Sequence, residues 1–112
     1  MEINELERLR VYLGDTQRAH GKLVYEAVVQ AALEKGLAGA TAFKGIMGFG
    51  GHHHIHTTKI LQLSEDLPIV VEIIDIPANI DAFLPVLEGL VTQGLVTRDP
   101  VHCVLCKLAP VS

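Results

Sequence analysis

Apolar and polar residues alternate along the first stretch of the chain, residues 6–13. Leu9, Val11 and Leu13 fall on one side of an extended chain, and mostly polar or charged residues fall on the other. A period of two is typical of a strand with one buried face. The sequence GDT follows at residues 14–16 and has the composition of a turn. The pattern therefore predicts a first strand that ends near Leu13.

The period then changes to that of a helix. Within residues 20–36, apolar side chains recur at helical spacing, and Gly36 follows Lys35 as expected where a helix stops. A second apolar set with helical spacing covers residues 80–91. Pro85 lies inside this set and removes one backbone hydrogen bond, so the helix either starts late or bends there. Two amphipathic helices are expected.

Further segments have the character of strands. Residues 39–49 lead into a glycine-rich stretch, and residues 59–63 alternate again, as the returning arm of a hairpin would. Residues 67–76 are almost entirely apolar and β-branched, which is typical of a strand flanked by neighbours. The last strand is predicted around Val101 to Leu105. This order predicts an α+β, ferredoxin-like βαββαβ fold: an antiparallel sheet, two helices on one face, and a long loop or small hairpin after the second strand.

Length and charge exclude several classes of protein. The chain has 112 residues, 49% of them hydrophobic, and a net charge of −4. This length suffices for one packed core, so residues 1–112 are expected to form a single domain. There is no run of Lys or Arg to neutralise nucleic-acid phosphates, no apolar run of the roughly 18 residues that span a membrane, and no targeting signal at either end. We expect a cytoplasmic protein that binds no nucleic acid and does not insert into membranes.

Residues 44–59, KGIMGFGGHHHIHTTK, combine glycines with histidines. Glycine admits positive φ and lets backbone N–H groups converge on an anion, and either flanking lysine, Lys44 or Lys59, could supply charge to a phosphate. The stretch is not a P-loop, because no GK[ST] and no helix follow at the required spacing. A hinge whose glycines serve only backbone geometry is the alternative. Both interpretations remain open.

The histidines suggest a metal site. His52, His54 and His56 would point the same way in an extended segment, and an i, i+2 pair of imidazoles can chelate Zn²⁺, Ni²⁺ or Cu²⁺. Histidines at a loop tip can also bind metal only adventitiously. A divalent metal is therefore a candidate ligand, and no metal or other cofactor is required.

Other polar residues have structural as well as functional interpretations. Cys103 and Cys106 form C-x-x-C, but a strand would point their thiols to opposite faces, which favours ordinary buried thiols over a redox or zinc pair. Glu72, within the apolar run 67–76, is expected to pair with a basic residue at a subunit contact. No Ser/His/Asp or Cys/His set with supporting context is present, and spacing brings no two carboxylates together, so an enzyme is not expected.

Two more expectations concern single residues near the predicted element ends. His20 and Lys22 lie where the first strand hands over to the helix, and they either cap the helix or contact a ligand. Lys44, besides its phosphate interpretation, could pair with Glu72 across the sheet.

Four segments carry a resemblance to known proteins: HGK at residues 20–22, GLAGAT at 36–41, GIMGFG at 45–50, and IHTTKILQLSEDLPIVVEIID at 55–75. With the order of elements, they resemble the PII-like superfamily, which includes nitrogen-regulatory PII proteins and CutA proteins. The resemblance is closest to its uncharacterised branch, domain-of-unknown-function family 190, and runs from about Leu9 to Leu105. It implies a homotrimer with inward-facing sheets and small-ligand clefts between subunits. The segment between the second and third strands would be the mobile T-loop, which in PII proteins senses ligand and touches partners.

The chain departs from PII proteins after the second helix. PII proteins carry a glycine- and basic-rich phosphate loop there, whereas this chain reads TQGLVTRDP, with Gly94 and Arg98. ATP binding in the PII manner is therefore not implied, and a smaller or differently held nucleotide remains open.

The resemblance implies a regulatory protein that binds a small anionic effector, foremost an adenine nucleotide, between subunits. The effector would be held by residues of the loop and by Arg98 of a neighbouring subunit. The loop residues concerned are Lys44, Gly45, Gly48, Gly50 and Lys59. Binding would order the loop, which would dock or release a partner such as a transporter or an enzyme. The alternatives are a CutA-like divalent-metal-binding protein that uses the loop histidines, and a structural trimer without ligand.

Overall fold

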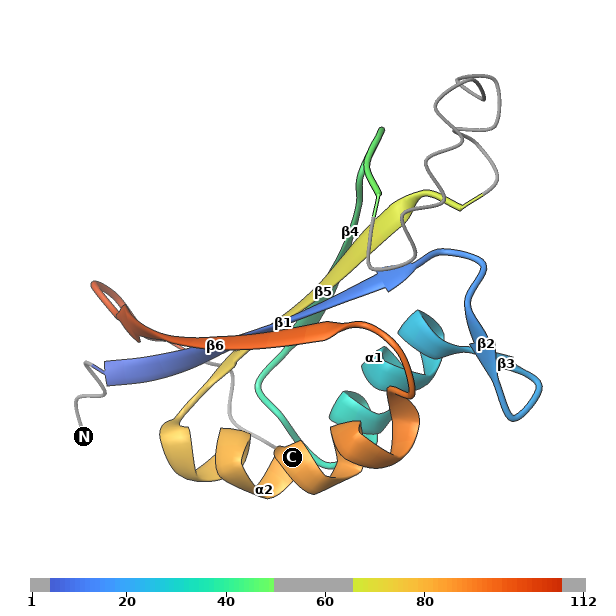
Figure 1. Ribbon diagram of the computed structural model, residues 1–112. Coiled ribbons are helices and arrows are strands. Elements are labelled where there is room, and N and C mark those ends of the chain that lie inside the picture. Colours follow the sequence, from blue (N-terminus) through green and yellow to red (C-terminus); the bar gives the residue numbers. More distant parts are fainter. Residues whose placement is uncertain (1–4, 50–65, 108–112) are drawn as a thin grey trace.

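The computed structural model describes residues 5–49 and 66–107. Its elements, in chain order, are β1 (Glu5–Gly14), β2 (Arg18–Ala19), β3 (Lys22–Leu23), α1 (Val24–Glu34), β4 (Ala40–Lys44), β5 (Pro68–Asp75), α2 (Pro77–Leu90) and β6 (Leu95–His102). Four strands form an antiparallel sheet in the order β4-β5-β1-β6, and both helices lie on one face of it (Figure 1). Because β5 lies between β1 and β4, this is the split arrangement of a ferredoxin-like fold. The predicted α+β class is confirmed.

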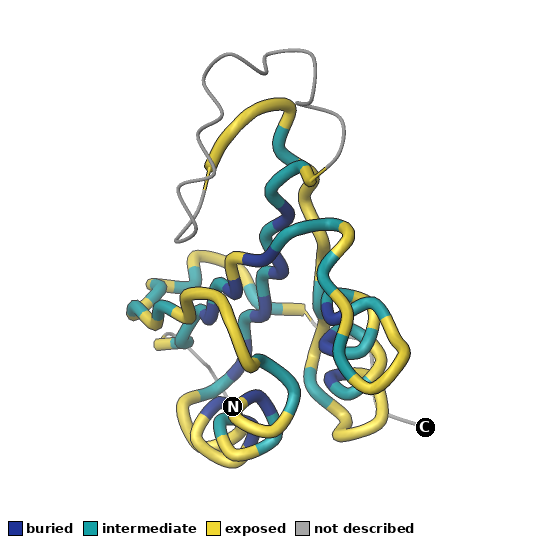
Figure 2. Tube along the Cα trace, turned by 45° about the vertical axis from the view of Figure 1, so that its right-hand side comes forward, coloured by how far each residue is buried: buried dark blue, intermediate teal, exposed yellow. Residues whose placement is uncertain are grey.

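The core lies between the sheet and the two helices. In β1 every second residue from Leu9 to Leu13 is buried, as its alternation predicted, and in β5 every second residue from Ile69 to Ile73 is buried. Figure 2 shows the buried positions in the helices and in the middle of the sheet. The helices contribute Val24, Val28, Ala32, Ile80, Phe83 and Leu87 to the core. The intervening strand residues face away from the helices.

The last strand begins earlier than predicted. β6 runs from Leu95 to His102, not from Val101 to Leu105, and it pairs with β1 at the edge of the sheet. Residues 97–100, TRDP, weaken the sequence signal of this strand, because charged residues and a proline interrupt the apolar alternation. On the edge these residues are tolerated: Asp99 pairs with Arg8 on β1, and edge strands are where proline is found within sheets.

The helices also differ in detail from the expectation. α1 begins at Val24 with Leu23 as its N-cap, and no side chain in the described part of the chain caps it. His20 (φ 54°) and Gly21 (φ 78°) instead form the turn of the β2–β3 hairpin, so the predicted capping role of His20 and Lys22 is wrong. α2 starts early, at Pro77, and continues through Pro85. Neither helix is long and apolar enough to cross a membrane, within the residues described.

Candidate functional site at the loop end of the sheet

One end of the sheet gathers the segments that the sequence singled out. β1 ends at Gly14 and β4 ends at Lys44, while β5 begins at Pro68 and β6 begins at Leu95. We call this the loop end, because β4 ends and β5 begins here (Figure 1). The candidate site is built from the described residues of this end.

Lys44 is held at the loop end by a carboxylate. Its Nζ lies 3.1 Å from Oδ2 of Asp15, with the lysine side chain 58% exposed and the aspartate 13% exposed. Asp15 is itself anchored to Leu67: its Oδ1 accepts the Leu67 N–H at 3.0 Å, and its own N–H donates to the Leu67 carbonyl at 2.9 Å. From the sequence, Asp15 was assigned only to a turn, and this role was missed. An acidic residue just after a strand was the available signal.

Glu72 pairs with a basic residue, as expected, but that residue is not Lys44. The Oε2 of Glu72 lies 3.1 Å from Nε of Arg10, which is directly opposite on β1 of the same chain, and the predicted subunit contact at Glu72 stays a prediction. Lys44 is opposite Ile69, and Ile69 faces the helices, whereas Glu72 faces away from them. Lys44 and Glu72 therefore lie on opposite faces of the sheet and cannot pair.

Gly45 and Gly48, the first glycines of the loop, lie against the ring of Pro68. The Gly45 N–H donates to the Pro68 carbonyl at 2.7 Å and extends the β4–β5 pairing by one bond. A Cβ on Gly45 would lie 2.7 Å from Cγ of Pro68, and one on Gly48 would lie 3.0 Å from the same atom. A side chain at either position would crowd the ring of Pro68, which is a steric reason for glycine at both. In this conformation the Gly45 N–H is already bonded to the Pro68 carbonyl.

Side chains of the turn after β1 tie the loop end together. Thr16 donates its hydroxyl to Oδ1 of Asp66 at 3.2 Å, which places a second carboxylate beside Gly14. Gln17 accepts the Gly14 N–H through Oε1 at 3.2 Å and donates from Nε2 to the carbonyl of Gln93 at 2.6 Å. The turn therefore links the start of β5 to the connection between α2 and β6.

Gly94, which lies in the connection between α2 and β6, has a steric role. Its φ is 144°, and a Cβ there would lie 2.7 Å from the carbonyl oxygen of Tyr12. The connection between α2 and β6 can approach β1 this closely only without a side chain.

Arg98 is bound within its own chain. Nη1 donates to Oδ1 of Asp81 at 2.6 Å and Nε donates to Oε1 of Glu7 at 2.8 Å, and these hydrogen bonds raise the pKa of Arg98. It lies opposite Leu9, four residues before Leu13, so within one chain it is not at the loop end. Its contact with a ligand of a neighbouring subunit stays a prediction.

Several predicted site residues lie outside the described residues. These are Gly50, Lys59, His52, His54 and His56, together with the predicted hairpin arm at 59–63. Within residues 5–49 and 66–107, no three or more His, Cys, Asp or Glu side chains are grouped so as to hold a metal ion.

The two cysteines follow the last strand instead of lying in it. β6 ends at His102, so the expectation that a strand points their thiols apart is wrong. Cys103 and Cys106 are half-buried free thiols. Burial, and then the hydrogen bond and charge of Cys106, raise the pKa of Cys103 above its ordinary value.

We expect Cys103 to alkylate more slowly at pH 8 than a cysteine in an unfolded peptide. Only the thiolate reacts, and a raised pKa lowers the thiolate fraction at that pH. The rate of iodoacetamide labelling should therefore rise with pH around an inflection above the peptide value. Cys106→Ser should lower this inflection, since it removes a neighbouring charge. Mass spectrometry with fragmentation separates the two cysteines, and an inflection at or below the peptide value would contradict the prediction.

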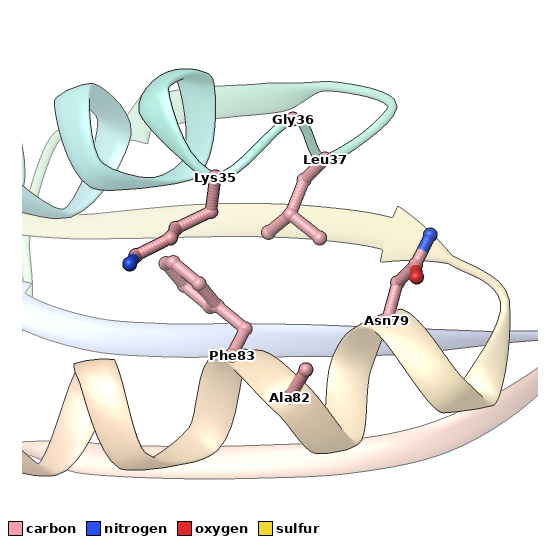
Figure 3. A pocket seen from close by; sticks show the side chains of 6 residues that line it. All are labelled: Lys35, Gly36, Leu37, Asn79, Ala82 and Phe83. Carbon is pink, nitrogen blue, oxygen red and sulfur yellow. The ribbon is translucent and has the colours of Figure 1, made fainter.

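Two surface cavities lie at the opposite end of the sheet. One, of about 140 Å³, is lined by the end of α1 and the start of α2, and Figure 3 shows Lys35 and Leu37 facing Asn79, Ala82 and Phe83 across it. The other, of about 200 Å³, is lined by α1 and residues 37–40. Neither is at the loop end.

Residues 6–103 match the family model DUF190, described as uncharacterized ACR, COG1993. A UPF0166 protein of Aquifex aeolicus (strain VF5) is 36% identical over 104 residues, covering 93% of this chain and 98% of that protein. Another UPF0166 protein, from Methanocaldococcus jannaschii, is 34% identical over 95 residues, covering 84% of this chain and 87% of that protein.

Two solved structures of CPII from Thiomonas intermedia K12 have a similar fold. The structure bound to ADP, AMP and acetate has a TM-score of 0.55 at 16% identity, with 92% of both chains covered. The structure bound to ADP and bicarbonate has a TM-score of 0.55 at 18% identity, with 88% of both chains covered. The fold is thus PII-like, and since the family model spans nearly the whole sequence, the chain belongs to the uncharacterised DUF190 family.

Proposed function

We propose that this protein is a PII-like regulator that binds an adenine nucleotide at the loop end of the sheet. The observation that carries the proposal is the convergence there of Lys44, the glycines Gly45 and Gly48, and the turn at Gln93 and Gly94, at the mouth of the segment 45–67. A cation beside glycine backbone is suited to a phosphate. The CPII structures hold ADP and AMP, which supports adenine as the base.

The proposed assembly is a homotrimer whose sheets face inward. Four side chains lie directly opposite one another across the sheet, on the face without helices. We call them the apolar row: Phe43, Val70, Tyr12 and Leu95. Three of these are substantially exposed in the single chain, at 52% for Phe43, 38% for Tyr12 and 58% for Leu95. Second and third copies of the chain would cover this row. To reach a neighbour's effector, Arg98 would have to release one of its two acidic partners. Asp81 is suited to be that partner, because its side chain is exposed.

In this proposal the effector acts through the segment 45–67. A glycine-rich segment loses much conformational freedom when it is ordered, and the contacts of the effector must offset that cost. An effector that favours one conformation of the segment shifts its population. The segment then docks or releases a protein partner, such as a transporter or an enzyme.

Calorimetry with AMP, ADP and ATP on tag-free protein tests the proposal. Lys44→Ala should weaken nucleotide binding by about ten- to a hundredfold, the value of a hydrogen bond to a charged group. Lys35→Ala, which removes the same side chain at the opposite end of the sheet, is the matched control and should bind like the native protein. The proposal fails if no nucleotide binds at millimolar concentration, or if both variants bind equally. Stoichiometric metal in the native protein would favour the metal-binding alternative.

A further inference from the structure

Without an effector, Lys44 is already paired with an anion, the carboxylate of Asp15. The Asp15 carboxylate is 3.1 Å from the Lys44 amine, and it is the more buried partner of the two. Two hydrogen bonds join Asp15 to Leu67, one from the Leu67 N–H to the Asp15 carboxylate and one from the Asp15 N–H to the Leu67 carbonyl. This carboxylate is therefore held in place, whereas the lysine side chain is 58% exposed. A phosphate that approaches Lys44 must therefore displace the amine from Asp15 or share it with Asp15.

The described charges of the loop end add to this effect. Asp66 lies at the same end, on the hydroxyl of Thr16, so a second carboxylate is present near the Lys44–Asp15 pair. Each further negative charge on a ligand is repelled by these two carboxylates. Multiply charged phosphates lose the most, because the repulsion grows with their charge.

We infer that Asp15 competes with the effector for Lys44 and thereby makes the site select phosphates of low negative charge. The inference rests on the proposed nucleotide site and deepens it. The ligand class it names is a nucleoside monophosphate in preference to a triphosphate, when no metal ion neutralises the phosphates. Asp15 is thus a specificity-determining residue.

Asp15→Asn is the sharpest variant, because it removes the charge and keeps the shape. The asparagine oxygen can still accept the Leu67 N–H, so the turn is preserved. In metal-free buffer, native protein should bind AMP more tightly than ATP. The variant should bind ATP about tenfold more tightly than native protein does, about the effect of one charged hydrogen bond, and its gain for AMP should be smaller. Asp66→Asn, which removes a charge that does not touch Lys44, should give a smaller gain.

Two readouts separate failure of this inference from failure of the proposed function. If native protein and both variants bind no nucleotide, the proposed site is lost and the inference with it. If native protein binds but Asp15→Asn gains nothing, or gains equally for AMP and ATP, the inference alone is overturned, because a purely structural role would act equally on both. The acetylation rate of Lys44 by acetic anhydride tests the ion pair directly. It should rise in Asp15→Asn, and an unchanged rate would also overturn the inference.

Discussion

Replacing Val70 by lysine is expected to convert the proposed trimer into monomers at micromolar concentration. Val70 lies at the centre of the apolar row, directly opposite both Phe43 and Tyr12. An ammonium group there would be buried without a partner between subunits, which costs on the order of 3–5 kcal/mol in each contact. In the isolated chain the lysine stem can lie along the half-exposed sheet and the amine can reach water, so the monomer should fold.

Ion pairs next to the apolar row are compatible with burial of this face in the proposed trimer. Arg10 pairs with Glu72 at 3.1 Å, and Arg8 pairs with Asp99 at 2.6 Å. The hydrogen bond from Arg8 holds the pKa of Asp99 below its ordinary value, so this pair stays charged at neutral and mildly acidic pH. Because each charge already has a partner in its own chain, burial by a neighbour leaves none unpaired.

Light scattering coupled to size-exclusion chromatography measures the outcome, with circular dichroism to verify folding. The control is Gln30→Lys, which adds the same charge on the exposed side of α1, where Glu34 is close. This variant should keep the native mass. A monomeric native protein would refute the trimer, and an unchanged mass for a folded Val70→Lys variant would show that this face is not the interface.

Two strands gave a strong sequence signal, β1 through its alternation and β5 through its nearly continuous run of apolar, β-branched residues. β1 and β5 are central, and their residues from Leu9 to Leu13 and from Ile69 to Ile73 alternate between core and open face. β6 is an edge strand with many exposed residues, and it is joined to β1 by a charged pair, Arg8 with Asp99. Its sequence therefore shows little hydrophobic periodicity. The β2–β3 hairpin has two-residue strands, too short for any periodicity.

The candidate site was predictable in part, for a similar reason. Lys44 stood out because it begins a glycine-rich stretch, which is a local property. Its partner Asp15 is distant in the chain, and the two meet only because β5 lies between β1 and β4 in one register. The roles of Gly45 and Gly48 likewise depend on Pro68, a residue of another strand. Contacts of this kind require the sheet order, which periodicity does not supply.

Asp75, for which no role was predicted from the sequence, joins three segments at the opposite end of the sheet. The residue is 7% exposed. Oδ2 accepts the Ala38 N–H at 2.8 Å, and Oδ1 accepts the Ile76 N–H at 2.7 Å and the amide of Asn79 at 3.0 Å. It thereby fixes the end of β5 to the connection before β4 and to the first turn of α2, where a negative charge also favours the helix dipole. An acidic residue two positions before the helix-starting Pro77 was the available signal.

Asp75→Ala is therefore expected to lower the free energy of unfolding by about 3–5 kcal/mol, since it leaves donors of a buried site without their charged acceptor. This is a large part of the roughly 5–15 kcal/mol that stabilises a typical domain. Asp81→Ala is the matched control, because its carboxylate is 65% exposed and Arg98 keeps Glu7 as a partner, so its cost should stay within about 1 kcal/mol. Urea denaturation followed by circular dichroism, at one protein concentration for all variants, measures both. Asp75→Asn should fall between them, because its oxygen can still accept one or two of the three bonds. If Asp75→Ala costs no more than Asp81→Ala, the carboxylate does not hold these segments together.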